Sequence, residues 1–205
     1  YFLGSNAGLE IVGGSILNHE HYQGGSAHFP IEDAKSFKTY HINHVQVDLL
    51  IWPLSVTRFT SNDRDAIIHL ADQLRIYYES YCDESVDLVT SQANPHNAIT
   101  PIVRKKDDVY IVDIALRNNR VNEQYPDGIF HPHQDVHAIK KENIGLIEVM
   151  GLAILPGRLL NDLLEIENCL ENHIDLPEDL NTYKEWVKRL ELDLDLSIKE
   201  NIKRA

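Results

Sequence analysis

The sequence feature that most constrains this chain is a polar segment bounded by glycine pairs, residues 13–25, which reads GGSILNHEHYQGG. The apolar residues that precede its histidines favour an extended backbone, in which successive side chains point to opposite faces of the strand. We therefore expect His19, His21 and Gln23 to share one face. Paired glycines allow another backbone segment to approach closely, and their amides can face an anion. The segment is typical of a strand that handles a phosphate group.

The charge balance narrows the class of partner. The 205 residues include 32 acidic and 19 basic side chains, for a net charge of −13. A nucleic-acid polymer is therefore excluded as the expected partner, because duplex binding depends on cations that neutralise phosphates. A phosphorylated small molecule stays compatible, since a local pocket can differ in sign from the whole surface. The 43 % hydrophobic content predicts a globular chain with a sizeable core.

The cysteine content and the hydropathy of the sequence predict the cellular compartment of the protein. Cys82 and Cys169 are too few and too far apart for a disulfide framework or a metal knuckle, so we expect reduced thiols. No apolar run approaches the roughly 20 residues that span a bilayer, and no basic-then-apolar leader appears. We expect a cytoplasmic protein with no membrane partner. The apolar start at Tyr1, without an initiator methionine, favours a piece excised from a longer chain.

Hydrophobic periodicity predicts an α+β fold, an antiparallel sheet flanked by helices. Residues 1–157 are expected to form mainly the sheet core of a single domain spanning 1–205, with 158–205 as a helical tail. The segment 24–38 is predicted to be a loop. Strands are predicted twice within 1–23 and over 41–52, 86–90, 99–104, 109–116, 129–133 and 144–155; helices are predicted over 63–81, 158–170 and 180–190.

Several further motifs occur in a specific order along the chain. They are NAG at 6–8, NPHNAITP at 94–101, LRNNR at 116–120, GIFHPH at 128–133 and the run 139–156. Together with residues 13–25, they resemble the histidine-triad-like superfamily and, within it, the galactose-1-phosphate uridylyltransferases of the class II bacterial branch. The resemblance covers most of the chain up to about residue 160. It implies that the N-terminal part of a transferase precedes this chain.

His21 is the predicted nucleophile. A neutral imidazole can attack phosphorus and form a phosphoramidate that a second nucleophile later opens. The resemblance implies that this histidine takes the uridylyl group from UDP-glucose and passes it to galactose 1-phosphate, with ping-pong kinetics. Gln23 carries no charge to repel a phosphate, and its amide can donate to a non-bridging oxygen. The alternatives are a metal-ligand or core role for His21 and an ordinary exposed strand position for Gln23.

The resemblance also implies a set of substrate contacts. Cationic side chains near the sugar phosphate would compensate its charge, although the protein as a whole is acidic. Each of these cations, considered alone, could also be an ordinary surface charge. The nucleotide and phosphate contacts expected are Asn6, Gly14, Ser15, Arg117 and Arg120. The sugar-phosphate contacts expected are Lys140, Lys141, Asn143 and Arg158.

Three histidines form a candidate metal site. His131 and His133 would share a strand face, and neutral imidazoles suit a metal such as zinc or iron. In the better-known branch of the family, a histidine in a turn and a later His-x-His join a glutamate at a structural metal. His96, His131 and His133 match that pattern, and Glu32 is a candidate for the carboxylate. The alternative is a substrate-facing loop.

His19 departs from the family pattern. In the better-known branch, the matching histidine joins a zinc site with an upstream cysteine pair. This chain lacks that pair and has Glu20 where the branch has proline. His19 is therefore either a metal ligand or a residue that orients the strand through a hydrogen bond.

Three functions follow from these patterns. The leading hypothesis is a UDP-glucose–hexose-1-phosphate uridylyltransferase of galactose metabolism. The second is a histidine-triad nucleotide hydrolase or phosphorylase, although Gln23 replaces the third histidine of that motif. The third is a metal-stabilised binding module without chemistry of its own. The resemblance further implies a homo-oligomer.

Overall fold

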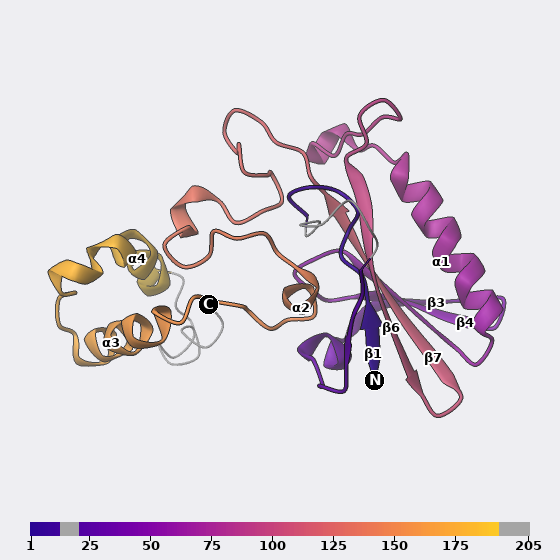
Figure 1. Ribbon diagram of the computed structural model, residues 1–205, viewed down its shortest axis with the longest axis horizontal. Coiled ribbons are helices and arrows are strands. Elements are labelled where there is room, and N and C mark those ends of the chain that lie inside the picture. Colours follow the sequence, from indigo (N-terminus) through magenta and orange to yellow (C-terminus); the bar gives the residue numbers. More distant parts are fainter. Residues whose placement is uncertain (13–20, 193–205) are drawn as a thin grey trace. The chain divides into compact units, whose positions relative to one another are not determined.

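The computed structural model describes residues 1–12 and 21–192, and these residues have the predicted α+β architecture. The chain divides into two compact units. The sheet unit comprises residues 1–131 and 143–153, and the helical unit comprises residues 132–142 and those from 154 onward. Figure 1 labels several of the helices and strands, which are numbered in chain order.

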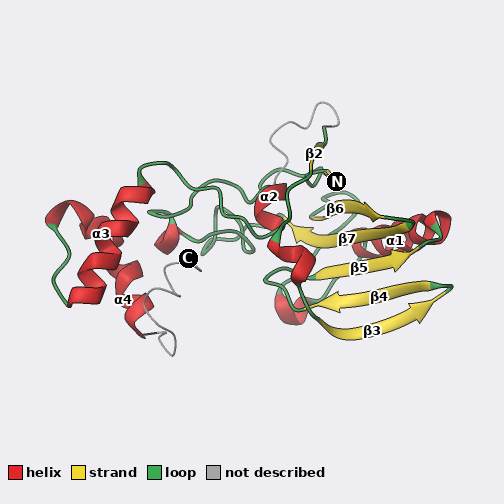
Figure 2. Ribbon diagram, turned by 90° about the horizontal axis from the view of Figure 1, so that it is seen from below, coloured by secondary structure: helices red, strands yellow, loops and turns green. Residues whose placement is uncertain are grey.

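Among the described residues of the sheet unit, seven strands form one antiparallel sheet in the order β2-β1-β6-β7-β5-β4-β3 (Figure 2). Asn43 and His44 close the β3–β4 hairpin with positive φ angles of 46° and 64°, the backbone that a two-residue turn of primed type requires. The strands are β1 Phe2–Gly4, β2 Gln23–Gly25, β3 Ser36–Ile42, β4 Val45–Leu50, β5 Val56–Ser61, β6 Asn97–Lys106 and β7 Val109–Asn118.

Helices in the described ranges are of α and 3-10 type. The α-helices are α1 Arg64–Glu79, α2 Leu146–Val149, α3 Leu159–Asn172 and α4 Lys184–Leu192. The 3-10 helices are η1 Pro30–Asp33, η2 Glu84–Val86, η3 Gln134–Val136 and η4 Glu178–Tyr183. Asp63 caps α1, because its carboxylate accepts hydrogen bonds from the amides of Asp65 and Ala66.

The two faces of the sheet carry separate apolar clusters. On one face, Ile67 of α1 packs with strand residues that include Val47 and Ile114, and α1 runs along this face (Figure 1). On the other face, η1 and α2 contribute Ile31 and Leu146 to a cluster with core residues of the strands. The central strands are thus buried on both faces.

The helical unit has a core of its own. Its buried side chains come from α3, η4, α4 and Ile139. Tyr183 is buried, its hydroxyl accepts a hydrogen bond from Arg158 Nη1 at 2.7 Å and it donates to the carboxylate of Asp162. None of the helices described in either unit is long and apolar enough to cross a membrane.

Several of the predicted elements are confirmed. The helix predicted over 63–81 is α1, those over 158–170 and 180–190 correspond to α3 and to η4 with α4, and the hairpin at 105–108 joins β6 to β7. The strand predicted over 41–52 is shorter, because the turn at residues 43–44 precedes β4.

Other predicted elements are wrong. Residues 36–38, predicted to lie in a loop, begin β3, and β5 was not predicted. The strand expected over 86–90 is replaced by η2 and a turn, where Asp83 accepts from Ser85 N and Asp87 adopts a φ of 58°. The strand expected over 144–155 is α2, because positions 146, 149 and 150 all enter the core, which is helical spacing. Residues 129–133 lie in turns and bends rather than in a strand.

Candidate functional site

His21 and Gln23 lie where the chain enters the sheet. Gln23 is the first residue of β2 and pairs with Gly4 of β1. His21 precedes β2 by two residues and is half-buried, whereas Gln23 is exposed. The structure therefore holds both side chains next to the end of β1. His19, Gly14 and Ser15 lie outside the described residues.

Ser5 connects the backbone of His21 to the rest of the sheet. Its hydroxyl donates to the carbonyl oxygens of Asn6 at 3.2 Å and His21 at 3.4 Å. Its amide donates to the carbonyl of Pro101 on β6 at 3.2 Å. The position of the His21 backbone is consequently fixed relative to β6.

Glycine allows the tight packing around β1. A Cβ on Gly4 would lie 2.9 Å from Leu146 Cδ1 and 3.0 Å from the Pro101 carbonyl oxygen. A Cβ on Gly24 would lie 3.0 Å from the Phe2 carbonyl oxygen. The close approach expected of the second glycine pair is present at Gly24.

Asn6 joins the same region to α2. Its Oδ1 accepts a hydrogen bond of 2.8 Å from the amide of Leu146, the first residue of α2. Glu148 reaches back and accepts from the amide of Gly145 at 2.8 Å. Because Oδ1 is occupied, the group that Asn6 has left to offer a ligand is its amide NH₂, a donor that suits a phosphate oxygen.

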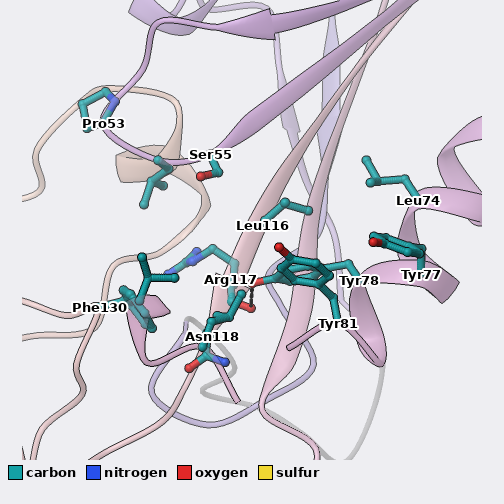
Figure 3. Close-up of a pocket in the computed structure, with 13 residues that line it drawn as sticks. Pro53, Ser55, Leu74, Tyr77, Tyr78, Tyr81, Leu116, Arg117, Asn118 and Phe130 are labelled. Carbon is teal, nitrogen blue, oxygen red and sulfur yellow. Dashed lines mark hydrogen bonds between the residues drawn. The ribbon is translucent and has the colours of Figure 1, made fainter. Parts of the chain in front are cut away.

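Arg117 is a buried cation at the end of β7. Its guanidinium donates to the Ile144 carbonyl at 3.0 Å and to the Thr100 hydroxyl at 3.4 Å. Burial lowers the pKa of Arg117 to about 10, partly opposed by the charge of Glu148. The Tyr78 hydroxyl donates to the Arg117 carbonyl at 3.0 Å (Figure 3).

The contacts of Arg117 lead back to His21. Thr100 is adjacent to Pro101, which accepts from Ser5, and Ile144 is two residues before Leu146, which donates to Asn6. Two of the predicted phosphate contacts, Asn6 and Arg117, thus belong to one hydrogen-bonded neighbourhood with the predicted nucleophile.

Arg120, the third predicted phosphate contact with described atoms, is engaged elsewhere. Its guanidinium contacts the Asp87 carbonyl and donates to the Asp87 carboxylate at 2.7 Å. Arg120 lines a shallow pocket with His96. Its charge is therefore partly compensated within the protein.

The predicted metal ligands His96, His131 and His133 lie outside the strands. Both ring nitrogens of His96 are engaged, Nδ1 with Asn119 Oδ1 and Nε2 with Asn94 Nδ2, each at 2.8 Å. His131 is buried in a bend and His133 precedes η3, so the expected shared strand face is wrong. Across residues 1–12 and 21–192, no group of three or more histidine, cysteine, aspartate or glutamate side chains is placed to hold a metal ion.

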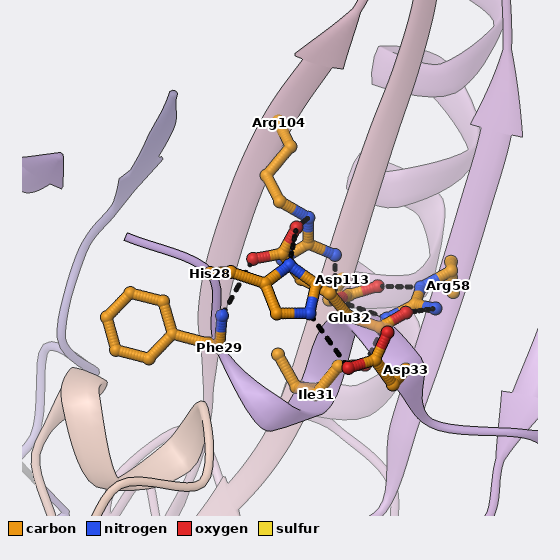
Figure 4. Close-up of polar contacts among 8 residues, drawn as sticks. All are labelled: His28, Phe29, Ile31, Glu32, Asp33, Arg58, Arg104 and Asp113. Carbon is orange, nitrogen blue, oxygen red and sulfur yellow. Dashed lines mark hydrogen bonds and ion pairs between the residues drawn. The ribbon is translucent and has the colours of Figure 1, made fainter. Parts of the chain in front are cut away.

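Glu32, the suggested carboxylate ligand, belongs to a different cluster. It accepts from the Phe29 amide at 2.9 Å and lies 3.5 Å from His28 Nδ1 and 3.9 Å from Arg104 Nε (Figure 4). Glu32 is therefore engaged in a cluster with His28 and Arg104.

The predicted sugar-phosphate contacts fall in both units. Asn143 is exposed in the sheet unit. In the helical unit, Lys141 is exposed, Lys140 donates to the Ile154 carbonyl at 3.2 Å and lies 3.7 Å from Glu142, and Arg158 contacts Tyr183 and Asp162. Their role stays a prediction.

Sequence reasoning missed Ser5, Thr100 and Tyr78. Each is a common residue whose importance comes from a partner far along the chain, such as Arg117 for Thr100 and Tyr78. The one available signal was the tyrosine-rich segment 77–81 at the end of α1 and just after it, where aromatic side chains extend beyond the core-facing stripe.

Comparisons with known proteins agree with this arrangement. The family described as "Galactose-1-phosphate uridyl transferase, C-terminal domain" matches residues 1–182. Relatives called galactose-1-phosphate uridylyltransferase include one from Clostridium perfringens, 47 % identical over 199 residues, and one from Streptococcus thermophilus, 52 % identical over 176 residues. These matches cover 95 % and 83 % of this chain but 40 % and 35 % of those proteins. No solved structure matches.

The fold and the site define an α+β protein whose antiparallel sheet carries a histidine and a glutamine two residues apart at its edge. The chain belongs to the galactose-1-phosphate uridyl transferase family and matches its C-terminal domain. It spans about 40 % of the length of the Clostridium perfringens relative.

Proposed function

We propose that this chain is part of a UDP-glucose–hexose-1-phosphate uridylyltransferase. The observation that carries the proposal is the placement of His21 and Gln23 two residues apart at the start of β2, in a chain of this family. A nucleophilic imidazole beside an uncharged amide donor is the pair that transfer of a uridylyl group needs.

The reaction proceeds in two displacements. A ring nitrogen of His21 attacks the α-phosphorus of UDP-glucose, a P–N bond forms, and the P–O bond to glucose 1-phosphate breaks with its electron pair on the leaving oxygen. A phosphate oxygen of galactose 1-phosphate then attacks the same phosphorus, and the P–N bond breaks to release His21 and UDP-galactose. Gln23 donates its amide N–H to a non-bridging oxygen as negative charge builds there.

The neighbours of His21 have supporting roles. Ser5 fixes the backbone of His21 through its carbonyl. Asn6 keeps its amide NH₂ for a phosphate oxygen while Oδ1 is bonded to Leu146. Arg117 supplies positive charge near the His21 backbone. It donates to Thr100, which is next to the Pro101 whose carbonyl accepts from Ser5. These contacts keep the nucleophile and the phosphate in a defined geometry, which converts binding energy into rate.

The proposed partners are UDP-glucose or UDP-galactose, a hexose 1-phosphate, and the part of a longer polypeptide that corresponds to the rest of the relatives. A second copy of the chain completes the proposed assembly. Cys82 is an exposed thiol with no disulfide, which supports a reducing compartment such as the cytoplasm.

Intact-protein mass spectrometry tests the covalent step. The full-length protein is incubated with UDP-glucose and compared with His21→Ala and with His69→Ala, a control that removes an exposed histidine from α1. We expect a uridylyl-sized mass gain in the wild type and in His69→Ala that is absent in His21→Ala. A gain that persists in His21→Ala would reject His21 as the nucleophile, and no gain in a protein that binds UDP-glucose would reject the transfer mechanism.

A further inference from the structure

A cavity of about 550 Å³ opens in the sheet unit. It lies at the end of the sheet where β7 extends beyond the start of β5. The Ser55 carbonyl makes the last backbone bond between the two segments, with the amide of Leu116. At the next residue of β7, the Arg117 carbonyl accepts a hydrogen bond from the Tyr78 hydroxyl of α1 instead of from a strand backbone. The cavity therefore lies beside the part of β7 that β5 does not pair with.

Four aromatic rings lie in the wall of this cavity. Tyr77 and Tyr78 line it from the end of α1, Tyr81 from just after α1, and Phe130 from the loop after β7 (Figure 3). Tyr77 is 64 % exposed and Phe130 is 46 % exposed, and the rings of Tyr77 and Tyr81 lie 5.6 Å apart. These exposed rings contribute little to the core of the unit and present π faces on which a planar ligand can stack.

Arg117 gives the cavity a positive charge. The residue is 5 % exposed, its two hydrogen-bond partners are neutral oxygens, and within the described chain its guanidinium forms no ion pair. Figure 3 shows the guanidinium extending away from the Tyr78 ring toward Phe130. The charge of Glu148 only partly opposes the effect of burial on the pKa of Arg117, and a buried cation without an ion pair is stabilised by an anion beside it.

We propose that this cavity is a binding site for a small molecule that joins a planar ring to a phosphate or carboxylate group, with the ring among the tyrosines and Phe130 and the anion at Arg117. The volume lies within the roughly 300–1,000 Å³ of typical ligand sites, and few polar groups in an apolar wall are their usual composition. Neither His21 nor Gln23 lines the cavity. The cavity shares Arg117 with the proposed transfer site, and its aromatic wall is additional to the residues proposed there.

Isothermal titration of the full-length protein with UMP tests this site, because UMP carries both a ring and a phosphate. Tyr77→Ala and Phe130→Ala remove the exposed rings without emptying the core. Phe37→Ala is the matched control, since Phe37 is a 65 % exposed aromatic residue on β3, outside the cavity. Uridine and inorganic phosphate are titrated as half-probes that keep only the ring or only the charge.

We expect both cavity variants to lose one UMP-binding event per chain or to weaken it about tenfold, as removal of a stacking ring does, while Phe37→Ala binds like the wild type. Either half-probe should bind this site at least about tenfold more weakly than UMP. Equal stoichiometry and affinity in the wild type and both cavity variants would overturn the proposal. Inorganic phosphate bound as tightly as UMP would also overturn it, because the ring would then contribute nothing.

Discussion

Arg58 of β5 holds Asp113 of β7 through two parallel hydrogen bonds, from Nε to Oδ1 at 2.6 Å and from Nη2 to Oδ2 at 3.0 Å (Figure 4). Asp113 is fully buried, and Arg104 of β6 donates to the same carboxylate. Arg58 also donates to the Ile31 carbonyl of η1 at 2.7 Å. One carboxylate therefore joins three neighbouring strands, and Arg58 extends the network to η1.

Asp113→Asn is expected to lower the free energy of unfolding by about 3–5 kcal/mol, because it leaves two buried guanidinium groups without their shared counter-charge. Urea denaturation followed by circular dichroism measures the change. Asp72→Asn is the control, since the Asp72 side chain is 53 % exposed and its pair with Arg75 lies on the surface of α1; this variant should change stability by less than about 1 kcal/mol. Equal effects would show that the Asp113 charge is not what stabilises the sheet.

Gly4→Ala is expected to destabilise the protein by about 1–3 kcal/mol, since the new Cβ would lie 2.9 Å from Leu146 and 3.0 Å from the Pro101 carbonyl. Gly8→Ala is its matched control, because nothing lies within 4 Å of a Cβ at that position. Melting temperatures compare the two variants. A Gly4→Ala protein as stable as Gly8→Ala would mean that β1 and α2 separate without cost.

The fold was predictable from the sequence where burial follows a regular period. The apolar stripe of α1 and the strands β6 and β7 are examples. All seven residues of β3 are exposed, so no alternation marks it, and it is a strand because it pairs with β4. The four residues of α2 are too few to show a helical period against their β-branched composition.

The candidate site was predictable in part for a related reason. His21 and Gln23 follow from a local motif, and their position beside β1 follows from strand pairing. The hydrogen bond between Asn6 and Leu146 joins residues 140 positions apart, which no local pattern encodes. The strand face expected to be shared by His131 and His133 was wrong because the i, i+2 rule assumes a strand, whereas both residues lie in irregular backbone.

Tyr78 should make the stability depend on pH above 10. Burial raises its pKa to about 12 from the usual 10.0. Between these values the unfolded tyrosine has lost its proton while the folded one keeps it, so its contribution is complete below about pH 10 and falls by up to about 3 kcal/mol as pH rises to 12. Denaturation of wild type and Tyr78→Phe across this range measures it. Curves of equal slope would contradict the assignment.

Two substitutions of Asn6 test whether its Oδ1 supports the fold while its NH₂ group binds a phosphate. Asn6→Asp keeps an oxygen that accepts from the Leu146 amide, so unfolding should change by less than about 1 kcal/mol, whereas Asn6→Ala loses this bond and about 1 kcal/mol. A carboxylate cannot donate to a phosphate and repels it. If the proposed transfer is correct, Asn6→Asp should therefore raise KM for UDP-glucose about tenfold or more, with the fold intact.

The comparison of the two variants separates support of the fold from contact with the ligand. Loss of stability in Asn6→Ala with an unchanged KM would place Asn6 in a purely structural role, acting on α2 through Leu146. A raised KM in Asn6→Asp at wild-type stability would place the side chain of residue 6 close to the nucleotide phosphates. Because Ser5, the neighbour of Asn6, fixes the His21 carbonyl, the second outcome would also place the phosphate within reach of the nucleophile.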